Sequence, residues 1–142
     1  MCTACKSHVD VVFDEWIKPG VHINGLGGDC PGKTELELPL LFRSKVVVEY
    51  TPQSMIEGEI QRLTATEVKQ VVHGELWELI TKQKPGRIND QEVTVFDSVG
   101  FALEDYSVLR LIYNLANRHA IGQDLDLIPT LDDPKNLFAA IK

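Results

Sequence analysis

Three short apolar runs rich in valine and isoleucine recur along the chain. They cover residues 21–26, 45–50 and 92–97, and the first follows the turn signal Lys18-Pro19-Gly20 and runs into a glycine cluster. Near-continuous apolar runs of this length are typical of strands that are buried on both faces of a sheet. Upstream, the pattern predicts an extended stretch over residues 9–13 and a short helical turn over residues 14–17.

Helical patterns alternate with these runs. Thr34 and Glu37 have the spacing of a capping box, which predicts a short helix that reaches about residue 43. A second capping box, Thr64 with Glu67, precedes apolar residues at helical spacing and predicts one helix that stops at residues 84–86. The alternation of strands and helices predicts an α/β fold, with a parallel sheet covered by helices on both faces.

A long helix is predicted over residues 101–119, and it is apolar around most of its circumference. Since a surface helix needs one apolar face, we expect this helix to pack against two neighbours. A last short helix is predicted to begin at Asp133-Pro134. It too carries apolar residues that would have to be covered by another surface. The apolar residues concerned are Leu103, Tyr106, Val108, Leu109, Leu111, Ile112, Tyr113, Leu115 and Ala116 in the long helix, then Leu137, Phe138 and Ile141.

Length and charge narrow the classes of protein. The 142 residues fit one compact domain, and the net charge of −7 without a Lys/Arg cluster argues against nucleic-acid binding. No apolar window approaches the ~20 residues of a membrane helix, and the N-terminus lacks the order of a signal peptide, so we expect a cytoplasmic protein. The three cysteines, Cys2, Cys5 and Cys30, are too few and too irregular for a disulfide scaffold, and with His8 and His22 they lack the paired spacing of a zinc site.

The glycine cluster matches a nucleotide-binding motif. Residues 27–34 fit the P-loop pattern G-x-x-x-x-G-K-[ST], between a predicted strand and a predicted helix. Pro31 has no N–H to offer a phosphate, and Asp29 would bring negative charge into an anion cradle. A P-loop NTPase and a purely structural glycine turn are both alternatives here.

Three longer strings carry a more specific signal. Residues 22–36 (HINGLGGDCPGKTEL), 56–61 (IEGEIQ) and 93–106 (VTVFDSVGFALEDY) together resemble the ornithine cyclodeaminase/mu-crystallin family. The similarity extends from residues 1–5, which resemble the end of a sheet strand, to residues 133–138. It covers nearly all of this chain but less than half of a family member.

The resemblance implies a partial Rossmann-like parallel sheet, the second half of a dinucleotide-binding fold. We expect a single domain over residues 1–142, with the half fold in residues 1–100 and the long helix and tail in residues 101–142. In the family, NAD is reduced and reoxidised within one cycle that converts L-ornithine to L-proline and ammonia.

The resemblance also implies roles for individual residues. Asp29 would be the catalytic acid/base group and would contact the substrate, and Val99 would border the substrate as well. The cofactor-binding residues would be Thr3, Leu26, Gly27, Gly28, Lys33 and Ser98. An acid at the C-terminal end of a strand lies where α/β sheets bind ligands, although Lys33 as a surface lysine, Ser98 as a helix N-cap and Asp29 as a turn residue are the simpler interpretations.

The sequence departs from the family in one respect that bears on activity. It contains no G-x-G-x-x-G, so the loop that holds the pyrophosphate of NAD is absent. A half sheet would expose a parallel edge, which predicts a homo-oligomer or a complementary chain that supplies the N-terminal half. Three hypotheses follow: a half-enzyme that is inactive alone and needs a partner, a non-enzymatic self-associating remnant, and the NTPase.

Overall fold

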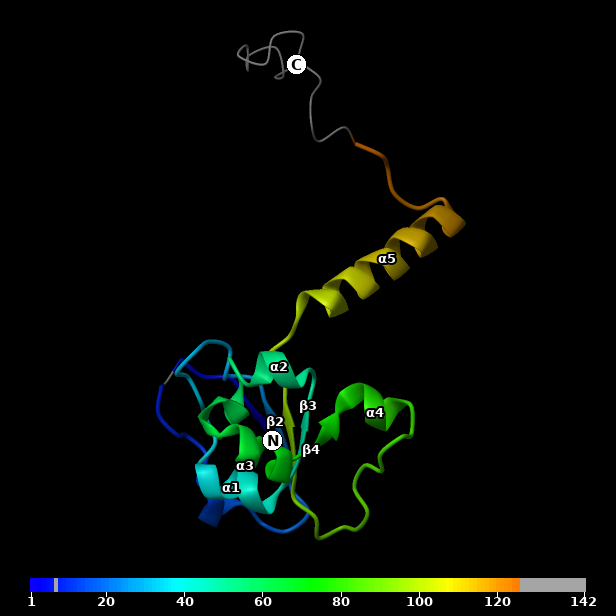
Figure 1. Cartoon of the computed structure of the whole chain (residues 1–142). Coiled ribbons are helices and arrows are strands. Elements are labelled where there is room, and N and C mark those ends of the chain that lie inside the picture. Colours follow the sequence, from blue (N-terminus) through cyan, green and yellow to red (C-terminus); the bar gives the residue numbers. More distant parts are fainter. Residues whose placement is uncertain (7, 126–142) are drawn as a thin grey trace, which may run out of the picture. The chain divides into compact units, whose positions relative to one another are not determined.

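Five strands form one parallel sheet in the computed structural model (Figure 1), which describes residues 1–6 and 8–125. The sheet belongs to a first unit, Met1–Ala102, and a second unit begins at Leu103. The three predicted strands are confirmed, and a fourth lies where the resemblance placed a strand end. The strands are β1 (Cys2–Thr3), β2 (His22–Gly25), β3 (Lys45–Val48), β4 (Val72–Glu75) and β5 (Thr94–Asp97), in the order β1-β2-β5-β3-β4.

Short helices connect the strands. The capping box of Thr64 and Glu67 is confirmed at the start of α3, but the predicted helix from there to residue 84 is wrong in its middle, where β4 interrupts it. Val72 and Gly74 pair with β3 instead, because a β-branched residue and a glycine lose little by leaving a helix and gain backbone hydrogen bonds in the sheet. The helices are α1 (Leu38–Arg43), α2 (Thr51–Ser54), α3 (Ala65–Val71), α4 (Leu76–Ile80) and α5 (Ala102–His119), with 3-10 turns η1 (Asp14–Trp16) and η2 (Glu59–Arg62).

The predicted capping box of Thr34 and Glu37 is also wrong, because α1 begins only at Leu38 with Glu37 as its N-cap. Residues 35–37 are instead extended and bonded to the segment around Val12. The Glu35 carbonyl accepts from the Val12 N–H, and the Glu37 N–H donates to the Val12 carbonyl. The extended stretch predicted over residues 9–13 is confirmed in its second part, where Val12 forms a parallel bridge with Leu36, whereas Val9 lies in a bend.

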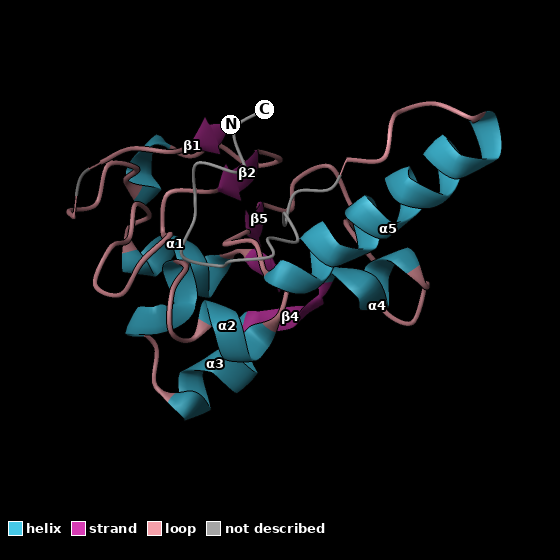
Figure 2. Cartoon of the chain, turned by 90° about the horizontal axis from the view of Figure 1, so that it is seen from above, coloured by secondary structure: helices cyan, strands magenta, loops and turns pink. Residues whose placement is uncertain are grey.

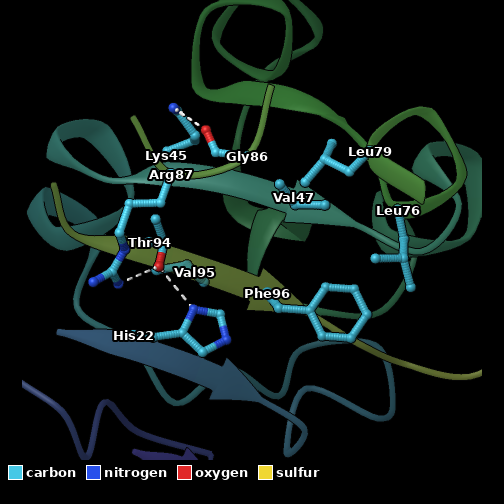
Figure 3. Close-up of a pocket in the computed structure, with 10 residues that line it drawn as sticks. All are labelled: His22, Lys45, Val47, Leu76, Leu79, Gly86, Arg87, Thr94, Val95 and Phe96. Atoms are coloured by element: carbon cyan, nitrogen blue, oxygen red, sulfur yellow. Dashed lines mark hydrogen bonds between the residues drawn. The ribbon is translucent and has the colours of Figure 1, made fainter. Parts of the chain in front are cut away.

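The two faces of the sheet differ in cover. One face is fully buried beneath α1, η2 and α3, which lie on the opposite side of the strands from α4 (Figures 1 and 2). The other face is open and forms a hollow of about 540 Å³ (Figure 3). Its lining is polar where the strands begin and apolar farther along, with His22, Lys45, Arg87 and Thr94, then Val47, Phe96, Leu76 and Leu79.

The long helix α5 is confirmed over Ala102–His119, and apolar residues lie around most of its circumference. None of its residues, all of which the structure describes, is buried, and Leu109 and Tyr113 are 65% and 66% exposed. The predicted helix after Asp133 lies outside the described residues. Among the helices of the described part, none combines the length and the apolar character needed to cross a membrane.

A series of three buried carboxyl groups ties the loops to the sheet. Asp97, the last residue of β5, accepts from the N–H groups of Glu59 (2.9 Å) and Ile60 (3.2 Å). Glu59 in turn accepts from the N–H groups of Glu35 and Leu36, both at 2.9 Å. Glu35 accepts from the N–H groups of Cys5 and Gly27, so each carboxyl group fixes the backbone that carries the next one.

These groups make stability depend on pH. Burial raises the pKa of Glu59 from 4.5, and that of Asp97 from 3.8, to about 7. Between about pH 4 and 7 the folded state therefore binds more protons than the unfolded state, so the free energy of unfolding falls as the pH rises through this window.

We predict that Glu59→Gln destabilises the chain at pH 5 by about 1–3 kcal/mol, because the amide nitrogen cannot accept from the backbone N–H groups. The difference in the free energy of unfolding between the variant and wild type should narrow towards pH 8, because only wild type then holds a buried charge at this position. Urea unfolding at pH 5, 6.5 and 8 measures both effects. The exposed Glu15→Gln is the control, and a difference that stays constant or widens with pH would contradict the prediction.

Candidate functional site

The C-terminal edge of the sheet brings three of the predicted cofactor residues into a row. Thr3 is paired with Gly25, and Gly25 with Asp97, so β1, β2 and β5 end at the same level. Leu26 donates its N–H to the Thr3 carbonyl, and Ser98 donates its N–H to the Gly25 carbonyl, both at 3.0 Å. This edge of a parallel sheet is where α/β proteins bind ligands.

The glycines after β2 are required by contacts inside the protein. A Cβ on Gly27 would lie 1.9 Å from the carboxyl carbon of Glu35, and a Cβ on Gly28 would lie 2.8 Å from the backbone of Gly58. Gly58 donates its N–H to the Gly28 carbonyl, and a Cβ on Gly58 would lie 2.9 Å from a methyl group of Val99. Gly58 thus lies between Gly28 and Val99 and brings these two predicted site residues to one place.

Asp29 and Lys33 form an ion pair at 2.7 Å within this loop. The side chain of Asp29 is 58% exposed whereas that of Lys33 is only 10% exposed, so Lys33 is not a solvated surface lysine. Their hydrogen bond lowers the pKa of Asp29 and raises that of Lys33. At neutral pH the pair is therefore fully charged, and Asp29 presents an ionised carboxylate that can accept a proton.

Ser98 and Val99 are held by Glu49, a residue that the sequence analysis did not single out. Its carboxylate accepts from the Ser98 hydroxyl (2.5 Å), the Val99 N–H (3.0 Å) and the Gly100 N–H. Because α5 begins at Ala102, Ser98 is not the helix N-cap. The signal for Glu49 was its place directly after a central strand, where an acid meets the end of the neighbouring strand.

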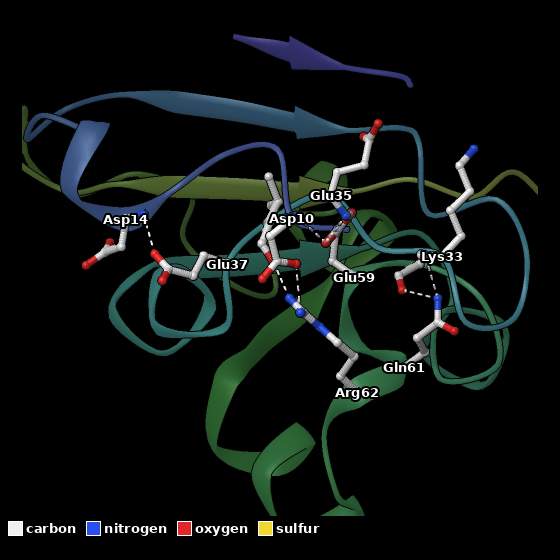
Figure 4. Close-up of polar contacts among 10 residues, drawn as sticks. Asp10, Asp14, Lys33, Glu35, Glu37, Glu59, Gln61 and Arg62 are labelled. Carbon is white, nitrogen blue, oxygen red and sulfur yellow. Dashed lines mark hydrogen bonds and ion pairs between the residues drawn. The ribbon is translucent and has the colours of Figure 1, made fainter. Parts of the chain in front are cut away.

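Gln61 holds the other side of the Asp29 loop (Figure 4). Its amide oxygen accepts from the Gly32 N–H (2.6 Å), and its amide nitrogen donates to the carbonyls of Lys33 and Gly58 (2.8 Å each). This residue ends the second string that carried the family resemblance, but no spacing rule assigns it a role. Glu35 and Glu59 were missed for the same reason.

The P-loop interpretation does not fit this geometry. A P-loop requires a helix that begins at its lysine, whereas α1 begins at Leu38 and Lys33 is bonded to Asp29. Asp97, at the end of β5, is buried and bonded to backbone N–H groups rather than free to hold magnesium. Within the described residues, His, Cys, Asp and Glu side chains form no group that could hold a metal ion.

Comparison with known proteins places this chain in a family. The model of the ornithine cyclodeaminase/mu-crystallin family matches residues 1–120. Ornithine cyclodeaminase of Agrobacterium tumefaciens (strain Ach5) is 44% identical over 139 residues, which are 98% of this chain but 38% of the relative. Alanine dehydrogenase of Archaeoglobus fulgidus is 37% identical over 127 residues, 39% of its length. The chain thus spans well under half the length of these relatives.

Solved structures show the same fold. An archaeal alanine dehydrogenase dimer with bound NAD has a TM-score of 0.79 at 36% identity, with 89% of this chain and 40% of that chain covered. A lysine cyclodeaminase has a TM-score of 0.72 at 31% identity, with 94% and 39% covered. The expected Rossmann-like parallel sheet with flanking helices is confirmed, and this chain belongs to the ornithine cyclodeaminase/mu-crystallin family.

Proposed function

We propose that this chain supplies the nicotinamide side of the active site of an enzyme that converts L-ornithine to L-proline and ammonia with NAD. The observation that carries the proposal is the ionised, solvent-facing Asp29 in the loop that continues from Leu26, which itself lies in a row with Thr3 and Ser98. The similarity to relatives named ornithine cyclodeaminase supports the choice of substrate.

The residues at this edge fit one end of a dinucleotide. Thr3, Leu26, Gly27, Gly28, Lys33 and Ser98 would hold it, and NAD, when bound, would take the hydride from the α-carbon of the substrate and return it. The sequence contains no G-x-G-x-x-G, so the residues named here account for one end of the dinucleotide only. We therefore propose that the chain does not complete the reaction alone.

Asp29 suits the proton chemistry of this reaction. Loss of hydride from the α-carbon leaves an imine only if the α-nitrogen also loses a proton, so a base must lie beside it. The ion pair with Lys33 keeps Asp29 ionised, with a pKa below its usual value, so the carboxylate can accept that proton only as a weak base, while the carboxyl group can readily return it to the departing ammonia. Val99, next to Gly58 and Gly28, would border the substrate.

We predict that NAD binds the chain weakly in the presence of L-ornithine, and that Lys33→Met raises its Kd about tenfold, the loss expected for one hydrogen bond to a charged group. Lys45→Met is the matched control. Lys45 forms a similarly buried ion pair with Glu92 at 2.8 Å, but it lies at the N-terminal end of β3, whereas the candidate site lies at the C-terminal edge of the sheet. This control should leave the Kd within about twofold. Isothermal titration calorimetry of the three proteins measures these constants.

An absence of heat with NAD would contradict a half-site that functions in this chain. Equal increases in the Kd for NAD in Lys33→Met and Lys45→Met would contradict the assignment of the loop that carries Lys33 to the NAD site. Proline formed by the chain without any other protein would show that a complementary half is not needed.

We further propose that the chain associates with itself or with a complementary chain. Two observations, one within each unit, support this: the open face of the sheet, since parallel sheets are normally covered on both faces, and the apolar circumference of α5, which is too wide for one neighbour. Self-association is the simpler arrangement because it needs no second gene product.

We predict that the chain forms oligomers in sedimentation velocity runs, and that Leu109→Glu shifts them to monomers by placing charge on apolar surface. Arg110→Gln, on the same helix, changes the net charge equally but removes no apolar surface, so it should leave the oligomers intact. A wild-type chain that is monomeric at all concentrations would contradict self-association and leave the complementary chain as the partner.

A further inference from the structure

Glu35 is a charged residue with no exposed surface that lies under the candidate site. Its two carboxylate oxygens accept from different loops: one from the Cys5 N–H, just after β1, and the other from the Gly27 N–H (3.0 Å), just after β2. The first loop follows Thr3, and the second leads into Asp29. One carboxylate therefore joins the two segments that carry the proposed cofactor and acid/base residues.

The backbone of Glu35 is itself fixed on both sides. Its N–H donates to Glu59, and its carbonyl accepts from the N–H groups of Val11 (2.8 Å) and Val12 (3.0 Å). Figure 4 shows the Glu35 side chain directed away from Glu59, which meets its backbone. A side chain anchored in this way is a fixed acceptor to which the two loops are bonded.

The charge on Glu35 is retained despite its burial. Burial by itself would raise its pKa, but hydrogen bonds from Thr3, Cys5 and Gly27 outweigh this effect and hold the pKa below its usual value. The carboxylate also explains Gly27, because any side chain there would overlap it. Ionised at neutral pH, Glu35 accepts charge-assisted hydrogen bonds, which are shorter and stronger than neutral ones.

We propose that Glu35 is a positioning residue of the candidate site, whose carboxylate holds the Thr3–Cys5 and Gly27–Asp29 segments in register for the nucleotide. The proposal rests on the proposed NAD site for its functional meaning. Glu35 itself has no exposed surface with which to touch a ligand, so it acts through the two backbone amides.

The test uses Glu35→Gln in the full chain, with Glu37→Gln as the matched control. Glu37 is two residues away and its carboxylate also accepts from a backbone N–H, that of Asp14 at 2.8 Å, away from the site. In ¹⁵N-edited spectra, Glu35→Gln should shift the amide protons of Cys5 and Gly27 upfield, because both lose a charged acceptor. Glu37→Gln should shift the Asp14 amide only.

The same two variants separate positioning from a general loss of stability. Glu35→Gln should raise the Kd for NAD, measured with L-ornithine present, by about tenfold, and Glu37→Gln should change it less than about twofold. Unchanged Cys5 and Gly27 signals, or an equal change in Kd for both variants, would overturn the proposal. If wild type does not bind NAD, the proposed function fails for this chain, while the amide signals still decide whether Glu35 joins the two segments.

If Glu35→Gln does not fold, Gly27→Ala tests the same contact by changing the donor instead of the acceptor. Its methyl group would displace the carboxylate, so it should shift the Cys5 amide although Cys5 is unchanged. An unshifted Cys5 signal in a folded Gly27→Ala protein would overturn the proposal.

Discussion

Three carboxyl groups without exposed surface, those of Asp97, Glu59 and Glu35, connect the last strand of the sheet to the loop after its second strand. A buried carboxylate costs several kcal/mol unless its oxygens accept hydrogen bonds, so each group constrains the backbone amides around it. The constraint passes from strand β5 to η2, then to residues 35–36, and then to Gly27. The site is therefore placed by buried polar bonds, whereas the apolar core places only the sheet beneath it.

The three groups are not equivalent, and the difference follows from their donors. Asp97 and Glu59 lie deeper and close to each other, so burial and the charge of Glu59 raise the pKa of Asp97. Glu35 has two side-chain donors, from Thr3 and Cys5, and two backbone donors, and together they keep its pKa low. Negative charge is thus held most firmly on the group that touches the site loops, where a strong acceptor for two amides is needed.

The elements set by apolar pattern were predictable, and those set by buried polar contacts were not. Runs containing valine and isoleucine predicted β2, β3 and β5 because apolar runs of this length are typical of buried strands, although only one face of the sheet is fully buried. β4 escaped notice because Val72 to Glu75 continue a helical pattern and become a strand only through pairing with β3. Asp29 and Lys33 were singled out from long matching strings, whereas Glu35 was not, since an acid in a sequence does not reveal that it will be buried. Glu49 was missed although it directly follows a central strand.

Residues 27–34 match the P-loop pattern but do not form a phosphate-binding loop, and a few neighbouring residues account for the difference. A phosphate cradle needs the backbone to enter a helix at the lysine, so that several N–H groups converge on one anion. Here the residues after Thr34 bond to the segment around Val12, and the N–H groups of Glu35 and Leu36 are taken by Glu59. No helix can begin at Lys33 under that constraint, and its ammonium group meets Asp29 instead. Because Glu59 takes up these N–H groups, the segment with the P-loop pattern forms a loop that presents the ionised carboxylate of Asp29.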